Sequence, residues 1–176
     1  MSVMELTDSD HLSALDGRLL RRAIQLSASA AAKGNMAFGA LLAGPDDSIL
    51  LEAENTTFTE RNPLNHAETN LVNMAVASLD PEQIATATLY TSCEPCAMCS
   101  GAMYWGGINR TVYAMSEHDL LEITGVSNHC PTMRGVGCRA ILNSGQRHIE
   151  VSGPHLVEEA CAVQIDYFAA RSPESS

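Results

Sequence analysis

Hydrophobic positions recur at helical spacing in four long segments of the chain and gather into short runs between them. Hydrophobic residues that recur every three to four positions form one buried helical face. The segments with this pattern are 8–33, 65–79, 96–105 and 155–170. The short apolar runs have the length of strands and cover 38–44, 48–55, 88–91, 110–115 and 148–153, and a further short helix is expected over 116–124. Strands that alternate with helices predict a three-layer α/β/α sandwich around a mixed five-stranded sheet.

Turn-forming residues predict where several of these elements begin and end. Asp16 is expected to cap the main part of the first helix. The sequence PDD at 45–47 joins the first two strands into a β-hairpin. Pro95 is expected in the first turn of the third helix, which Gly106–Gly107 then ends. Residues 127–147 show no sustained periodicity and are predicted to form a loop with one short helical turn.

The length of 176 residues is that of a single domain. We therefore expect one domain over 1–176, with flexible tails at 1–7 and 171–176. The first ten residues, MSVMELTDSD, lack the basic and then apolar pattern of a signal peptide, and no run of about 18 apolar residues follows. These features predict a cytoplasmic protein without a membrane partner.

The net charge and the cysteine content indicate which binding partners and which cysteine chemistry to expect. Ten Lys and Arg residues stand against 21 Asp and Glu residues, a formal net charge of -11. Such a surface repels polyphosphate, so a nucleic acid is a disfavoured partner. The six cysteines, in a reducing compartment, are expected to be metal ligands or small buried residues rather than disulfides.

Three of these cysteines lie in the stretch TSCEPCAMC at 91–99. Pro95 forces the preceding residue out of the helical conformation, which leaves Cys93 at the end of a strand and puts Cys96 and Cys99 one helical turn apart. Cys96 and Cys99 can therefore bind one ion. Cys93 is expected to be a buried residue of the strand end, although a closed structural zinc site that includes it is the alternative.

The sequence His-Ala-Glu, in which His66 precedes Glu68 by two positions, supplies the rest of a metal site. With His66, Cys96 and Cys99 as ligands, a Zn²⁺ ion keeps one open tetrahedral position for water, as catalytic zinc sites do. Glu68 is then the neighbouring base, not a ligand. The string H-x-E followed by P-C-x-x-C is the signature of zinc-dependent deaminases of nucleobases.

On these residues the chain resembles the cytidine and deoxycytidylate deaminase superfamily over roughly 36–123, and LYTSCEPCAMCSGAMYW resembles bacterial guanine deaminases in particular. The tRNA adenosine deaminases share Asn55, HAE and EPCxMC, whereas Trp105 matches the guanine type. The resemblance implies a cytidine-deaminase-like fold, a Zn²⁺ cofactor, a small nucleobase substrate and a homodimer.

The same resemblance implies roles for five further groups. Phe38 and Trp105 would form two aromatic walls for a purine, Asn55 and the backbone amide of Ala67 would hydrogen-bond the base edge, and Asp119 would assist proton transfer. Each side chain also has an ordinary structural alternative. The aromatic residues could be core, Asn55 could stabilise a turn, and Asp119 could cap a helix.

The expected reaction is therefore hydrolysis of guanine to xanthine and ammonia, with Glu68 carrying the proton. Three alternatives stay open at this point: deamination of adenosine in tRNA, deamination of cytosine or an aminotriazine such as ammeline, and a non-catalytic zinc-stabilised scaffold whose fourth ligand is Cys93.

Overall fold

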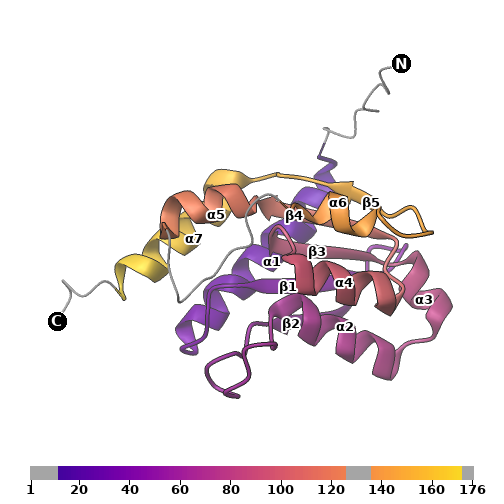
Figure 1. Cartoon of the computed structure of the whole chain (residues 1–176), viewed down its shortest axis with the longest axis horizontal. Coiled ribbons are helices and arrows are strands. Elements are labelled where there is room, and N and C mark those ends of the chain that lie inside the picture. Colours follow the sequence, from indigo (N-terminus) through magenta and orange to yellow (C-terminus); the bar gives the residue numbers. More distant parts are fainter. Residues whose placement is uncertain (1–11, 126–135, 172–176) are drawn as a thin grey trace.

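A mixed five-stranded sheet forms the centre of the computed structural model, which describes residues 12–125 and 136–171 (Figure 1). The strand order is β2-β1-β3-β4-β5; β1 is antiparallel to both of its neighbours, and β3, β4 and β5 run parallel. The strands are β1 (Gly39–Ala43), β2 (Ile49–Glu54), β3 (Thr88–Cys93), β4 (Arg110–Met115) and β5 (Glu150–Ser152). The expected tails at 1–7 and 171–176 lie outside the described residues, Arg171 excepted.

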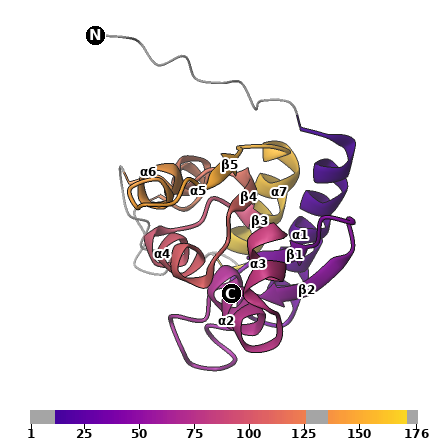
Figure 2. The same ribbon diagram turned by 90° about the vertical axis from the view of Figure 1, so that its right-hand side faces the viewer.

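Helices cover both faces of this sheet, and each face buries its own hydrophobic cluster (Figure 2). One face carries α1 (Ala14–Ala32), α5 (Glu117–Thr124) and α7 (Val157–Ala169). The other carries α2 (Ala67–Ser78), α3 (Pro81–Thr86), α4 (Ala97–Gly106) and α6 (Cys138–Leu142). The predicted three-layer sandwich is confirmed, and none of the helices among the described residues is long and apolar enough to span a membrane.

Two helix starts differ from the sequence-based expectation. The first helix begins at Ala14, and its cap is Ser13, whose Oγ accepts a hydrogen bond of 3.0 Å from the backbone amide of Asp16. The expectation that Asp16 caps this helix is therefore wrong. Pro95 does not lie in the first turn of α4 either, because Cys96, with an extended backbone, is the N-cap. The stop of α4 is confirmed, since Gly107 adopts a φ of 94°, which favours glycine.

Asp16 instead belongs to a polar network at the amino-terminal ends of β3 and β4. Its carboxylate accepts a hydrogen bond of 2.6 Å from the Tyr90 hydroxyl and one of 3.0 Å from the Arg110 guanidinium. The Asp16 side chain is only 13% exposed. Burial alone would raise the pKa of Asp16, but the hydrogen bonds from Arg110 and Tyr90 outweigh it and lower the pKa below its usual value of 3.8. The network therefore joins α1 to two central strands.

Asp16→Asn is expected to lower the free energy of unfolding by about 2 kcal/mol at pH 7, because Arg110 loses its buried partner. A carboxyl with a lowered folded-state pKa stabilises the protein above its unfolded pKa, and this contribution is lost as the pH falls through the folded value. Urea unfolding should thus show the difference between the two proteins shrinking below about pH 4. Glu159→Gln, which breaks the exposed pair with Arg21, is the control and should cost under about 1 kcal/mol.

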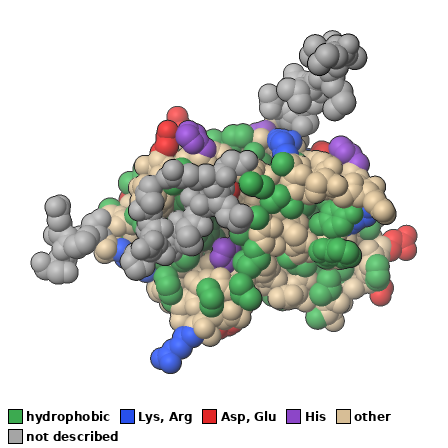
Figure 3. Space-filling view, in the orientation of Figure 1, with side chains coloured by type: hydrophobic (Ala, Val, Ile, Leu, Met, Phe, Trp, Pro, Cys, Tyr) green, Lys and Arg blue, Asp and Glu red, His purple; other side chains and the backbone are tan. Residues whose placement is uncertain are grey.

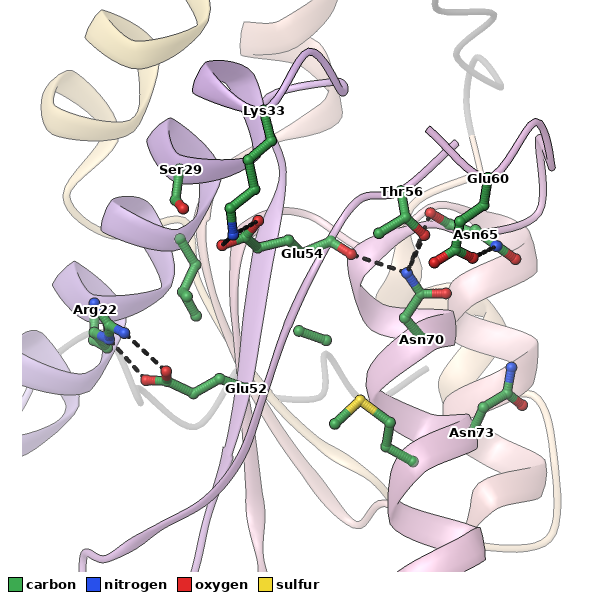
Figure 4. Close-up of a pocket in the computed structure, with 13 residues that line it drawn as sticks. Arg22, Ser29, Lys33, Glu52, Glu54, Thr56, Glu60, Asn65, Asn70 and Asn73 are labelled. Atoms are coloured by element: carbon green, nitrogen blue, oxygen red, sulfur yellow. Dashed lines mark hydrogen bonds and ion pairs between the residues drawn. The ribbon is translucent and has the colours of Figure 1, made fainter. Parts of the chain in front are cut away.

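The outer edge of β2 borders a groove of about 850 Å³ between α1 and α2 (Figure 4). Glu52 and Glu54 of this edge strand pair with Arg22 and Lys33 of α1 at 2.7 and 2.8 Å. Charged side chains along an edge strand oppose pairing with other strands. We therefore regard this groove as a protected sheet edge, separate from the cysteine and histidine residues described next.

Candidate metal centre and active site

The starts of α2 and α4 bring the predicted ligands together. His66 is the N-cap of α2 and Cys96 is the N-cap of α4, both with an extended backbone. Glu68 and Cys99 follow in the first turn of their helices. Within a helix, the side chains of residues two positions apart point about 200° away from each other. His66 precedes the first residue of α2 and has an extended backbone, so its ring and the Glu68 carboxylate can both face Cys99. The sulfur of Cys99 lies 3.5 Å from His66 Nδ1 and 3.4 Å from Glu68 Oε2.

The spacing of the three donor atoms fits a tetrahedral zinc ion. The two sulfurs of Cys96 and Cys99 are 3.5 Å apart, and His66 Nδ1 lies 3.7 Å and 3.5 Å from them. Bond lengths of about 2.3 Å to sulfur and about 2.0 Å to nitrogen require tetrahedral edges of roughly 3.8 Å between the two sulfurs and roughly 3.5 Å between sulfur and nitrogen. The pKa of the Cys96 thiol is lowered to about 4 by the Cys99 thiol and by His66, so one sulfur is poised as a thiolate. These residues therefore fit the metal in both geometry and chemistry.

Cys93 stands apart from this donor group. Among the residues that the structure describes, the only cluster that could hold a metal consists of His66, Cys96 and Cys99. Cys93 is 3% exposed and packs in the hydrophobic cluster on the α1 side of the sheet. This geometry favours an open fourth position over a closed structural site.

Glu68 is a buried carboxyl beside the metal ligands. It is 5% exposed, and its Oε1 accepts a hydrogen bond of 2.7 Å from the Thr91 hydroxyl. Burial raises the pKa of Glu68, which suits a group that must take up a proton and release it again. Its other oxygen faces the sulfur of Cys99. Glu68 therefore lies beside the possible metal ligands His66, Cys96 and Cys99 and is not one of that group.

Asn55 offers an unused hydrogen-bond donor. The side chain is fully buried, and its Oδ1 accepts hydrogen bonds from the amide of Thr57 at 3.1 Å and the Thr57 hydroxyl at 2.8 Å. These bonds fix the orientation of the amide, and its Nδ2 has no partner among the described residues. A buried donor without a partner costs free energy unless a ligand satisfies it. Asn55 is thus both a turn residue and a candidate substrate contact.

Two other predicted contacts lie next to these groups. The carbonyl of Phe38 accepts a hydrogen bond of 3.0 Å from the amide of Asn55, and the Phe38 ring is partly buried against both hydrophobic clusters. Ala67 is buried and is the first residue of α2, where backbone amides have no partner within the helix. Phe38 and Ala67 are therefore adjacent to Asn55 and His66, respectively.

Trp105 and Asp119 are not brought to the metal group within this chain. Trp105 is 87% exposed at the far end of α4, roughly 14 Å along the axis from Cys96. Its ring packs edge-on against Tyr104, with ring centres 5.8 Å apart. The carboxylate of Asp119 accepts hydrogen bonds of 2.8 and 2.6 Å from the amide and hydroxyl of Ser116, so it closes a capping box at the start of α5.

Glu117 is the acidic residue that the sequence reasoning missed. Its carboxyl is half-buried, and burial first, then the negative charges of Cys96, Glu94 and Glu68, raise its pKa to about 7. No hydrogen bond or ion pair of this side chain is found among the described residues. Its position just after β4, the parallel neighbour of the strand that leads to the cysteines, was the available signal. Glu117 is therefore a second acidic residue whose pKa is affected by the charges of Cys96 and Glu68.

Glu94 ties the cysteine loop to two helices. One carboxylate oxygen accepts a hydrogen bond of 3.2 Å from the amide of Glu117 at the start of α5. The other accepts one of 2.9 Å from the amide of Cys138 at the start of α6. The loop that carries the first cysteine ligand is thereby held against both neighbouring helices.

The fold and this site together are those of zinc-binding deaminases with a cytidine-deaminase-like architecture. A family model for the cytidine and deoxycytidylate deaminase zinc-binding region matches residues 13–115, and the chain belongs to this family. It is 36% identical over 152 residues to a probable cytosine deaminase of Schizosaccharomyces pombe, covering 86% of this chain and 91% of that protein. It is also 36% identical over 104 residues to a guanine deaminase of Bacillus subtilis, covering 58% of this chain and 66% of that protein.

Solved structures show the same fold. A protein crystallised with 2,6-diaminopurine superimposes with a TM-score of 0.77 and 26% identity, covering 92% of this chain and 85% of that one. A guanine deaminase from Nitrosomonas europaea gives a TM-score of 0.71 at 24% identity, covering 90% of this chain and 86% of that one.

Proposed function

We propose that this protein hydrolyses an exocyclic amine from a free nucleobase, with guanine as the substrate, xanthine as the product and ammonia as the leaving group. The observation that carries the proposal is the buried Glu68 carboxylate 3.4 Å from the sulfur of Cys99, within a donor set of tetrahedral spacing. The relationship to a guanine deaminase, and the purine held by a structural neighbour, support a purine.

The chain's own residues divide the proton transfers and the binding among them. His66, Cys96 and Cys99 would hold a zinc ion, which would supply the Lewis acidity that makes water a nucleophile at neutral pH. Glu68 would accept one proton from water and give it to the ring nitrogen; it would then take the second proton from the hydroxyl left on the ring carbon and give it to the amine, which leaves as ammonia. Asn55 donates its free Nδ2 hydrogens to an acceptor on the base.

Glu117 is a candidate for a second proton transfer or for binding an amine of the substrate, because its half-buried carboxyl lies near enough to Cys96, Glu94 and Glu68 for their charges to raise its pKa. The excess of 21 acidic over 10 basic residues disfavours tRNA as the substrate. Cytosine is the second candidate, because the probable cytosine deaminase is similar over most of both chains.

A homodimer is the assembly that we propose for this enzyme. Large hydrophobic side chains are exposed on α2, on α4 and in the segment that precedes α2. The space-filling view shows apolar side chains beside polar ones on the face turned to the viewer (Figure 3). The exposed large hydrophobic residues of these three segments are Phe58, Leu64, Met74, Val76 and Trp105. A second copy of the chain would cover such a surface, and Trp105 would then lie in the interface.

Release of ammonia from a substrate panel tests the proposed reaction. Guanine, guanosine, adenine, cytosine, ammeline and a tRNA anticodon stem-loop should be offered separately to the zinc-loaded protein, and we expect turnover of guanine. Turnover of cytosine alone would replace guanine by the second candidate, and activity on the RNA alone would overturn the free-base proposal. The absence of ammonia from every substrate would favour the non-catalytic scaffold.

A further inference from the structure

Thr91 is a fully buried hydroxyl in the middle of the sheet, directly beneath the site. It lies on β3 between Ala40 of β1 and Tyr113 of β4, so its backbone is held by strands on both sides. The Thr91 hydroxyl donates a hydrogen bond of 2.7 Å to Glu68 Oε1. The next hydroxyl along the strand, that of Ser92, instead accepts a hydrogen bond from the amide of Gly39.

This bond distinguishes the two oxygens of Glu68. Oε1 is engaged by Thr91, whereas Oε2 lies 3.4 Å from the sulfur of Cys99. A buried carboxylate that lost the hydroxyl would keep one oxygen without its donor and would turn to find another. The hydroxyl of the rigid strand therefore determines which oxygen of Glu68 faces the metal ligands.

We propose that Thr91 is a positioning residue, which holds Glu68 in the one orientation from which it can exchange protons at the metal centre. This inference rests on the proposed deaminase activity for its catalytic consequence, but the contact itself does not. The Thr91 hydroxyl is bonded to Glu68, and Thr91 acts on the site only through that carboxylate.

The kinetic test compares Thr91→Val, which keeps the shape and removes the hydroxyl, with Thr91→Ser, which keeps the hydroxyl. We expect Thr91→Val to lower kcat by about 10- to 100-fold, as the loss of a hydrogen bond to a charged group implies, with KM and zinc content unchanged. Thr91→Ser should retain kcat within about threefold.

Thr111→Val is the matched control. Thr111 is also fully buried, on the adjacent strand β4, and its hydroxyl donates to the carbonyl of Leu89 at 3.1 Å. It should lower the melting temperature without lowering kcat. Equal losses of kcat in Thr91→Val and Thr111→Val, or no recovery in Thr91→Ser, would overturn the positioning role.

A second test does not depend on activity: the melting temperature of the zinc-loaded protein is measured in a double-mutant cycle of Thr91 and Glu68. Thr91→Val should lower it by roughly 4 °C or more in the parent, because Glu68 is left without its donor. In a Glu68→Met background the same change should leave the melting temperature unchanged or raise it, since the hydroxyl then has no acceptor. Additive effects would overturn the proposal. A parent that releases no ammonia would refute the proposed function, yet this cycle would still test the contact.

Discussion

Glu68→Gln is expected to lower kcat by about 10³- to 10⁴-fold while the protein keeps its zinc. Glutamine preserves the shape of the side chain, and its oxygen can still accept the hydrogen bond that the Thr91 hydroxyl donates at 2.7 Å to Glu68 Oε1. It cannot take a proton from water or return one to the amine. The loss should therefore appear in kcat, measured by ammonia release, with zinc content measured by atomic absorption.

Glu122→Gln is the control for this change. Glu122 lies on α5 with a side chain 70% exposed and no role in the site, so its removal should leave kcat within about twofold. If Glu68→Gln retained the activity of the parent with zinc in place, another base would have to carry the proton, and the roles assigned to Glu68 and to Thr91 would both fail.

Cys99→Ala should abolish both zinc binding and activity. Cys99 is fully buried and its sulfur contacts both His66 Nδ1 and the sulfur of Cys96. With two donors left, the affinity for zinc falls by orders of magnitude, and the stabilisation that the bound ion gives the folded state is lost with it. We expect almost no zinc after dialysis against a chelator, no ammonia release, and a lower melting temperature than that of the zinc-loaded parent.

Cys93→Ala provides the matched comparison, because Cys93 is equally buried but packs in the hydrophobic cluster on the other side of the sheet. It should lose some stability and keep about one zinc ion per chain. Loss of zinc from Cys93→Ala would instead support the closed structural site of three cysteines and one histidine.

Local signals in the sequence predicted the layers and the metal ligands well, for a physical reason. Helical periodicity indicates which face of each segment is buried. The three-residue spacing of Cys96 and Cys99 places their side chains one turn apart on the same face of a helix. His66 was placed beside them from the His-Ala-Glu string and the need for a third ligand, since the contact between the starts of α2 and α4 is a tertiary one.

The errors fall where side chains far apart in sequence compete for the same role. Asp16 is a residue type that often caps helices, but its carboxylate instead accepts hydrogen bonds from Arg110 and Tyr90, which lie more than 70 positions away in the sequence. Helix α3 was missed because it has six residues and buries only Ile84, too little for a periodic pattern. Glu117 was not singled out, because only the folded position of α5 shows that its carboxyl is half-buried near Cys96 and Glu68.

The two ends of β3 and β4 have different roles. The network of Asp16, Tyr90 and Arg110 lies near their amino-terminal ends, whereas the segments after their carboxyl-terminal ends provide Cys96 and Glu117. The residues that stabilise the fold and the residues of the candidate site thus lie at opposite ends of the same two strands. A laboratory that wished to evolve this chain toward other amino-bearing heterocycles could vary the residues around the latter end while keeping the metal ligands, because the network at the former end would remain intact.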